Sequence, residues 1–172
     1  MQHLDLKKSD TFEQLKEQGT ALVAKEIITE AQEQSFDYQA VRAFFDTAIG
    51  KKMREATKVI RESPFSLALP TDEVYPAWNK EAAQETVLVQ GVIDVMIEDE
   101  DGLILLDYKT DHLGRFPTPE AAVAELKQRY TVQIRLYQRA IEQIWKRKVM
   151  RAGLYAFDIG CFVDLTKGGT SR

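Results

Sequence analysis

Two β-rich runs joined by a short acidic turn constrain the fold of this chain more than any other sequence feature. The runs cover residues 86–97 and 103–109, and the segment between them ends in Asp101-Gly102. An Asp-Gly step between apolar segments is a strong signal for a tight antiparallel hairpin. The sequence therefore predicts two adjacent strands in the middle of the chain, with the other elements arranged around them.

Three charged side chains interrupt these apolar strands. Asp107 and Lys109 are two residues apart, so they share one face of a strand with about 6.6–7 Å between them. A turn at Asp101-Gly102 would place Asp94 of the first strand opposite Lys109, whereas a turn at Glu100-Asp101 would place it opposite Asp107. Either register puts the three charges on one face, because directly paired residues point the same way.

The two carboxylates suggest a site for a cation. Neighbouring carboxylates repel each other, and one lysine can compensate only one of them. A divalent cation bound by oxygen ligands would neutralise both. The spacing alone is equally compatible with a surface Asp–Lys ion pair beside an unrelated aspartate on the other strand.

The hydrophobic pattern of the sequence changes once, from helical to strand-like, at about residue 58. Residues 1–57 are predicted to be helical, including a helix that begins near Asp37 and ends at Gly50. A strand over 58–70 contains Pro64, which indicates an edge strand or a bulge. We therefore divide the chain into a helical part, a core over 58–165, and a flexible C-terminal tail over 166–172.

A long helix follows the hairpin. Thr118 is a suitable N-cap and Pro119 a suitable first residue, and the pattern continues to about Lys146. A break is expected near 130–132, because these residues favour strands. A last strand is predicted over 149–159. This order of elements indicates an α/β or α+β fold with a central sheet flanked by helices.

Composition narrows the classes of protein. The single cysteine, Cys161, excludes an internal disulfide, an all-thiolate zinc site and a four-cysteine iron–sulfur cluster, which favours a reducing, cytoplasmic location. No apolar run approaches the roughly 20 residues that cross a bilayer, so no membrane partner is expected. A net charge of −4 means that bulk electrostatics does not draw the chain to nucleic acid.

The long helix carries one further pair of candidate residues. Gln133 and Tyr137 are one turn apart and share a face, although ordinary core packing is the usual explanation of such a pair. Segment 120–151 holds eight Lys or Arg against three Glu. This local positive charge could meet a phosphate backbone, but a solvated helix face is the simpler explanation.

Three motifs in order resemble a known family. Gly91-Val92-Ile93-Asp94, then Asp107-Tyr108-Lys109-Thr110, then residues 133–137 resemble the G-x-x-D, D-Y-K and Q-x-x-x-Y motifs of RecB-type nucleases of the PD-(D/E)XK superfamily. Residues 61–65 also resemble that group. The pattern is most similar to the C-terminal nuclease domain of the AddA component of bacterial AddAB helicase–nucleases, and it is strongest over 58–165.

The resemblance implies a restriction-endonuclease-like core and assigns roles to the residues of the hairpin. Asp94 and Asp107 would be metal ligands, and the Tyr108 carbonyl would be a backbone ligand. Lys109 would orient or activate the attacking water and stabilise charge on the phosphate. Glu62 would correspond to an upstream acidic residue near the metal.

The other implied properties concern cofactors and partners. Gln133 and Tyr137 would support the site or contact DNA, and Mg²⁺, or Mn²⁺ in vitro, would suit its oxygen ligands. The resemblance implies cleavage of a DNA strand delivered by a helicase during double-strand-break repair and recombination, in the AddA case the 3′-terminated strand. The partners would be an AddB-type protein and the parent helicase domains, and ATP would bind only to the helicase.

One departure from the family concerns a histidine. Family members carry a metal-binding histidine in a helix slightly ahead of the stretch that matches residues 1–3, so His3 lies too late to be that residue. We therefore expect an excised domain that folds but binds metal weakly and has low activity. Neither His3 nor His112 is expected to have a catalytic role. The alternatives are a catalytically silent docking or DNA-guiding module, and a superfamily nuclease of another context, such as a phage-type exonuclease or a restriction enzyme.

Overall fold

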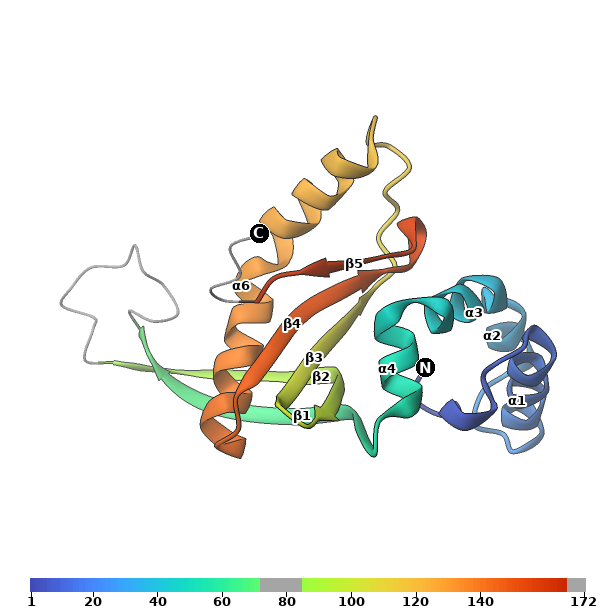
Figure 1. The fold of residues 1–172 in the computed structure, drawn as a ribbon, viewed down its shortest axis with the longest axis horizontal. Coiled ribbons are helices and arrows are strands. Elements are labelled where there is room, and N and C mark those ends of the chain that lie inside the picture. The colour runs from blue at the N-terminus through green and yellow to red at the C-terminus, as the bar shows by residue number, and fades with distance from the viewer. Residues whose placement is uncertain (72–84, 167–172) are drawn as a thin grey trace.

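The fold is built on one mixed sheet of five strands (Figure 1). The computed structural model describes residues 1–71 and 85–166. The strands lie in chain order, and all neighbouring pairs are antiparallel except β3 and β4, which are parallel. Their bounds are β1 (Lys58–Pro70), β2 (Thr86–Asp99), β3 (Gly102–Lys109), β4 (Val149–Ala156) and β5 (Cys161–Asp164). The predicted α/β architecture is therefore confirmed, with β1 at an edge.

Helices cover both faces of the sheet. Alternate residues of β3 point to opposite sides, so Leu103 and Leu105 join a core under α6, whereas Ile104 and Leu106 join a second core under the N-terminal helices. The helices are α1 (Phe12–Ala24), α2 (Glu30–Gln34), α3 (Tyr38–Asp46), α4 (Ala48–Glu55) and α6 (Pro119–Trp145). Short 3₁₀ turns occur at η1 (Leu6–Lys8) and η3 (Phe157–Ile159). In the two described parts of the chain, none of the helices has the combined length and apolarity that a bilayer span requires.

The prediction of a single helix from Asp37 to Gly50 is wrong. The structure has two helices, α3 and α4, because Thr47 adopts an extended conformation between them. Its hydroxyl donates to the Phe44 carbonyl and accepts the Gly50 N–H, so it serves both helix ends. Gly50 does not end the helix, which continues to Glu55. An added Cβ at Gly50 would lie 2.1 Å from the Phe44 carbonyl oxygen, so the close approach of the helices requires glycine there.

Two other local expectations are corrected, whereas the prediction that β1 is an edge strand or bulged is confirmed by its place at the edge of the sheet. The long helix α6 does not break near 130–132 but runs for 27 residues, with its predicted Thr118 cap and Pro119 start in place. The last strand ends at Ala156, and a 3₁₀ turn separates it from β5. The irregularity of β1 lies at Glu62, where φ is 52°, and Pro64 remains paired within the ladder. Apart from Thr166, the predicted C-terminal tail lies outside the described residues.

Candidate active site

The candidate site lies where β2 and β3 separate. The two strands pair from Asp99–Gly102 as far as Val95–Leu106, so the turn is Glu100-Asp101 and the register directs Asp94 toward Asp107. At the next position the ladder ends, and an Asp94 carboxylate oxygen accepts the Tyr108 N–H at 2.8 Å. Asp94 thus takes a backbone donor at the position where the strand pairing stops.

Asp107 and Lys109 lie on the α6 side of β3. They follow Leu103 and Leu105 at the same two-residue spacing, so they extend that core-facing row to the end of the strand. Asp107 is only 3% exposed, and its Oδ2 is 2.5 Å from the Lys109 ammonium nitrogen.

The Asp107 carboxylate is incompletely compensated. No residue in the described ranges donates a well-aligned hydrogen bond to its Oδ2, so the contact with Lys109 is an ion pair and not a hydrogen bond of good geometry. Burial raises the pKa of the Asp107 carboxyl above its ordinary value, Lys109 acts in the opposite direction, and Asp94 adds to the rise. A buried carboxylate of this kind is stabilised either by a proton or by a further positive charge.

Helix α6 supplies polar partners to Lys109. The ammonium group donates to Gln133 Oε1 at 3.5 Å, and Gln133 Nε2 donates to the Tyr137 hydroxyl at 2.9 Å. The Tyr137 ring packs edge to face on Phe65 of β1, with centroids 5.2 Å apart. The structure therefore brings Asp107, Lys109, Gln133 and Tyr137 into one continuous set of contacts.

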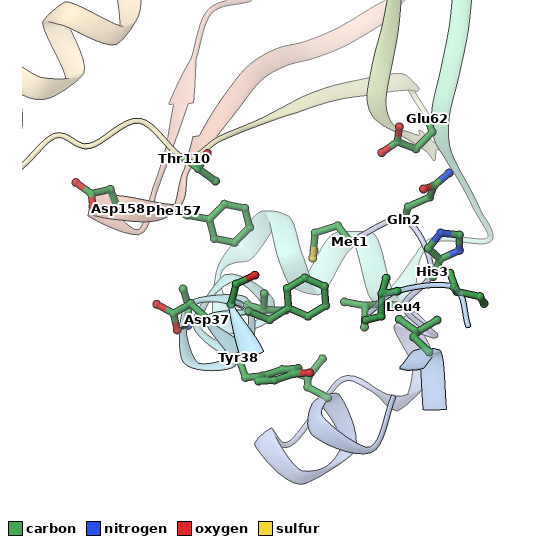
Figure 2. A pocket seen from close by; sticks show the side chains of 18 of the residues that line it. Met1, Gln2, His3, Leu4, Asp37, Tyr38, Glu62, Thr110, Phe157 and Asp158 are labelled. Atoms are coloured by element: carbon green, nitrogen blue, oxygen red, sulfur yellow. Dashed lines mark hydrogen bonds between the residues drawn. The ribbon is translucent and has the colours of Figure 1, made fainter. Parts of the chain in front are cut away.

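Glu62 lies apart from this set. The β1–β2 ladder pairs the residues on either side of Glu62 and Asp94 but not these two themselves. Glu62 lines a cavity of about 870 Å³ on the face that carries the N-terminal helices. Figure 2 shows its carboxylate at one end of that cavity, above Gln2 and His3, and His112 lines the same space. The Glu62 side chain therefore faces the opposite side of the sheet from the Lys109 side chain.

The donor set fits a hard divalent cation in chemistry. Asp94, Asp107 and the Tyr108 carbonyl would contribute oxygen ligands, and the Asp107 oxygen that lacks a well-aligned hydrogen bond is the group that such a cation would satisfy. Over residues 1–71 and 85–166, no three His, Cys, Asp or Glu side chains gather closely enough to hold a metal ion. The metal-ligand assignment accordingly stays a prediction.

Two residues beside Lys109 were missed by the sequence reasoning. The Lys109 ammonium lies 4.4 Å from the centroid of the Tyr130 ring, and the Tyr130 hydroxyl donates to Asp111. The sequence held a signal for both. Tyr130 precedes Gln133 by three residues on the same helix, and Asp111 follows Lys109 by two.

Comparison with known proteins decides the family. The model of the PD-(D/E)XK nuclease superfamily matches residues 2–166. The chain belongs to the PD-(D/E)XK nuclease superfamily. The motifs that resemble this superfamily map onto β2, β3 and α6, and these are the elements that meet at the candidate site. Family membership therefore agrees with the arrangement of Asp107, Lys109 and Gln133.

Curated relatives of this PD-(D/E)XK chain are ATP-dependent helicase/nuclease proteins of the AddA type. The protein from Bacillus velezensis is 46% identical over 167 residues, which is 96% of this chain and 13% of the relative. That from Anoxybacillus flavithermus is 45% identical over 165 residues, covering 96% of this chain and 12% of the relative. That from Bacillus cytotoxicus is 44% identical over 160 residues, covering 92% of this chain and 13% of the relative. The chain thus spans about an eighth of the length of these relatives.

Proposed function

We propose that this chain is a nuclease module that hydrolyses DNA phosphodiester bonds with the help of a divalent cation, Mg²⁺ or Mn²⁺. The observation that carries the proposal is the buried Asp107 carboxylate, in ion-pair contact with Lys109 at the end of β3 and next to Asp94. The relatives' name supports a role beside an ATP-driven helicase. The proposed setting is the processing of DNA ends for repair and recombination, with an AddB-type protein as partner.

Each residue has a role that follows from its position. A bound divalent cation would supply charge for a non-bridging phosphate oxygen and lower the pKa of a water ligand. Asp94, Asp107 and the Tyr108 carbonyl would hold that cation. The Lys109 ammonium would orient the attacking water and stabilise the negative charge that develops on the phosphate. Gln133 would direct the ammonium, and Tyr137 would hold Gln133 in place.

The test is cleavage of linear single-stranded DNA by wild type and Asp107→Asn, with Mg²⁺ and with Mn²⁺. The variant is expected to abolish cleavage and to weaken Mn²⁺ binding measured by calorimetry. Asp46→Asn, which changes an exposed carboxylate paired with Arg42, is the matched control and should cleave like wild type. Cleavage that survives Asp107→Asn would reject the assignment. The same comparison in a longer polypeptide, extended at its N-terminus, tests whether further residues complete the site.

Unfolding of the variant should not confuse this result. Because the folded-state pKa of Asp107 is raised, its contribution to stability falls as the pH rises from the ordinary aspartate pKa through the raised value. At neutral pH without divalent ions, Asp107→Asn removes this unfavourable charge. The variant should therefore melt at a temperature equal to or above that of wild type, and a lower Tm would contradict the raised pKa.

A catalytically silent docking or DNA-guiding module is the second candidate. It is favoured by one observation, namely that the described residues form no group of three metal-binding side chains. Suppose that the wild-type chain and its N-terminally extended form both bind DNA, and that neither of them binds Mn²⁺ or cleaves DNA. The nuclease proposal would then be rejected in favour of the docking or DNA-guiding module.

A further inference from the structure

Tyr130 presents its ring to the candidate catalytic lysine. The Lys109 ammonium nitrogen lies 4.4 Å from the ring centroid, within the range of a cation–π interaction. Tyr130, Gln133 and Tyr137 are spaced three and four residues apart, so they follow one face of α6. The helix therefore offers Lys109 two different contacts from successive turns, a ring face and the Gln133 amide oxygen.

The orientation of the Tyr130 ring is fixed from outside the helix. Its hydroxyl donates to both carboxylate oxygens of Asp111, at 2.9 and 3.0 Å. Arg129 donates to the same carboxylate at 2.6 Å and to Glu125 at 2.7 Å. Asp111 follows the end of β3 by two residues. The segment that leaves the strand of the site therefore holds the ring that contacts Lys109.

A lysine needs such support because its side chain is long and flexible. The ammonium is a compact charge on a four-carbon stem, and holding it in one place costs rotamer entropy. With Asp107 as its only partner, the Lys109 ammonium would be drawn toward the Asp107 and Asp94 carboxylates. A ring face attracts the ammonium without accepting one of its three N–H groups through a lone pair. The ring face therefore leaves the N–H groups that do not point to Gln133 free to reach Asp107, water or phosphate.

We propose that Tyr130 is a positioning residue, whose ring face, fixed by Asp111, holds the Lys109 ammonium between Asp107 and Gln133. The inference rests on the proposed function, in which Lys109 acts at the scissile phosphate. In this proposal Tyr130 contacts neither the DNA nor the divalent cation, and it acts only through Lys109.

The deciding experiment is an NMR measurement on the complete 172-residue chain with ¹³C-labelled lysine and no divalent ions. Protons above a tyrosine ring shift upfield, so the ε-methylene signal of Lys109, assigned by its loss in Lys109→Gln, should lie upfield of the exposed lysines. The shift should disappear in Tyr130→Leu and remain, although smaller, in Tyr130→Phe, which keeps the ring but loses its hydrogen bonds to Asp111. An unshifted Lys109 signal in wild type, or a shift that survives Tyr130→Leu, would overturn the inference.

Kinetics provide the second readout. Tyr130→Leu should lower kcat roughly three- to thirty-fold, the range that one cation–π contact supports, with KM for DNA unchanged. Tyr130→Phe, which keeps the ring but not the hydroxyl that Asp111 holds, should recover part of the lost rate. Phe162→Leu is the matched control, because it removes the contact of Phe162 with Arg151, which has the same 4.4 Å spacing but does not involve Lys109. Its kcat should equal that of wild type.

The two proposals fail in distinguishable ways. If Lys109→Gln cleaves as fast as wild type, the role proposed for Lys109 is wrong and Tyr130 has no catalytic lysine to position. The proposed function itself fails only if wild type does not cleave or Asp107→Asn still does. If Lys109→Gln is inactive but Tyr130→Leu retains the wild-type kcat, only the positioning role is wrong. The NMR shift requires no cleavage, so it decides the inference even for a chain that does not cut DNA.

Discussion

Gly91 lies beneath the two aromatic rings that connect β1 to the candidate site. A Cβ at this position would lie 2.9 Å from the Phe65 ring and 3.2 Å from the Tyr137 ring, closer than such contacts normally allow. Tyr137 accepts a hydrogen bond from Gln133, which in turn accepts one from Lys109. The absence of a side chain at Gly91 thus permits the packing that places the ammonium, which gives a physical reason for the glycine in the G-x-x-D motif.

Gly91→Ala should therefore disturb both packing and the site. Overpacking of this kind costs about 1–3 kcal/mol, which urea unfolding would detect. The displaced Tyr137 should also lower the rate of DNA cleavage. Gly114→Ala is the control, because a Cβ at Gly114 meets nothing within 4 Å. Equal stability of the two alanine variants would show that the rings move aside freely.

At the level of single residues, the sequence pointed to the candidate site residues but not to all the contacts that surround them. Asp94, Asp107 and Lys109 stood out because charges are unusual in apolar strands, and the hairpin alone placed them together. Tyr130 was overlooked because an aromatic residue on an amphipathic helix normally indicates core packing. Its contact with Asp111 depends on how the segment after β3 passes the helix, and no local pattern encodes that path.

Among the elements, the junction between α3 and α4 depends on one side chain. The Thr47 hydroxyl satisfies a carbonyl of α3 and an N–H of α4. The helices bring Phe44, Phe45 and Met53 into the core between the N-terminal helices and the sheet. Loss of the hydroxyl would leave the Gly50 N–H at the start of α4 without its cap, whereas the Phe44 carbonyl would keep the Thr47 backbone N–H as a donor.

Thr47→Ala should lower the free energy of unfolding by about 1 kcal/mol, as is typical for the loss of an N-cap. Chemical denaturation measures this change directly. Thr20→Ala in α1 provides the comparison, because the exposed Thr20 hydroxyl only donates to the carbonyl of Lys16 in its own helix. The comparison variant should stay within about 0.5 kcal/mol of wild type. A loss of similar size at both positions would contradict the capping role.

The elements that were predicted well have strong local signals, and those that were not depend on tertiary contacts. Thr118 and Pro119 marked the start of α6, and the apolar runs marked β2 and β3. The predicted break in α6 relied on the weak strand preference of residues 130–132. In the structure Thr131 donates to the Lys127 carbonyl and Val132 is 60% exposed, so neither disrupts a helix held by its apolar face.

For the whole molecule, β3 is the central element. It pairs with β2 on one side and β4 on the other, and both of its faces are buried. Leu105 and Leu106 are fully buried, one in each core. Strands with these surroundings open only when most of the domain unfolds.

Hydrogen exchange should follow this order. The amides of Leu105 and Leu106 are expected to be among the slowest to exchange, at rates set by global unfolding, whereas Phe162 in the short edge strand β5 should exchange faster. Exchange of β3 amides at the rate of Phe162 would indicate that the sheet opens from its centre. Residue-resolved NMR or mass spectrometry can make the comparison.

The position of Asp107 and Lys109 on the most enclosed strand has a consequence for inactivation. Because both groups lie on β3, the DNA cleavage proposed above should not be lost locally while the rest of the domain stays folded. On heating, loss of catalysis and the calorimetric transition should coincide, so residual enzyme activity would serve as a direct gauge of the population that is still native.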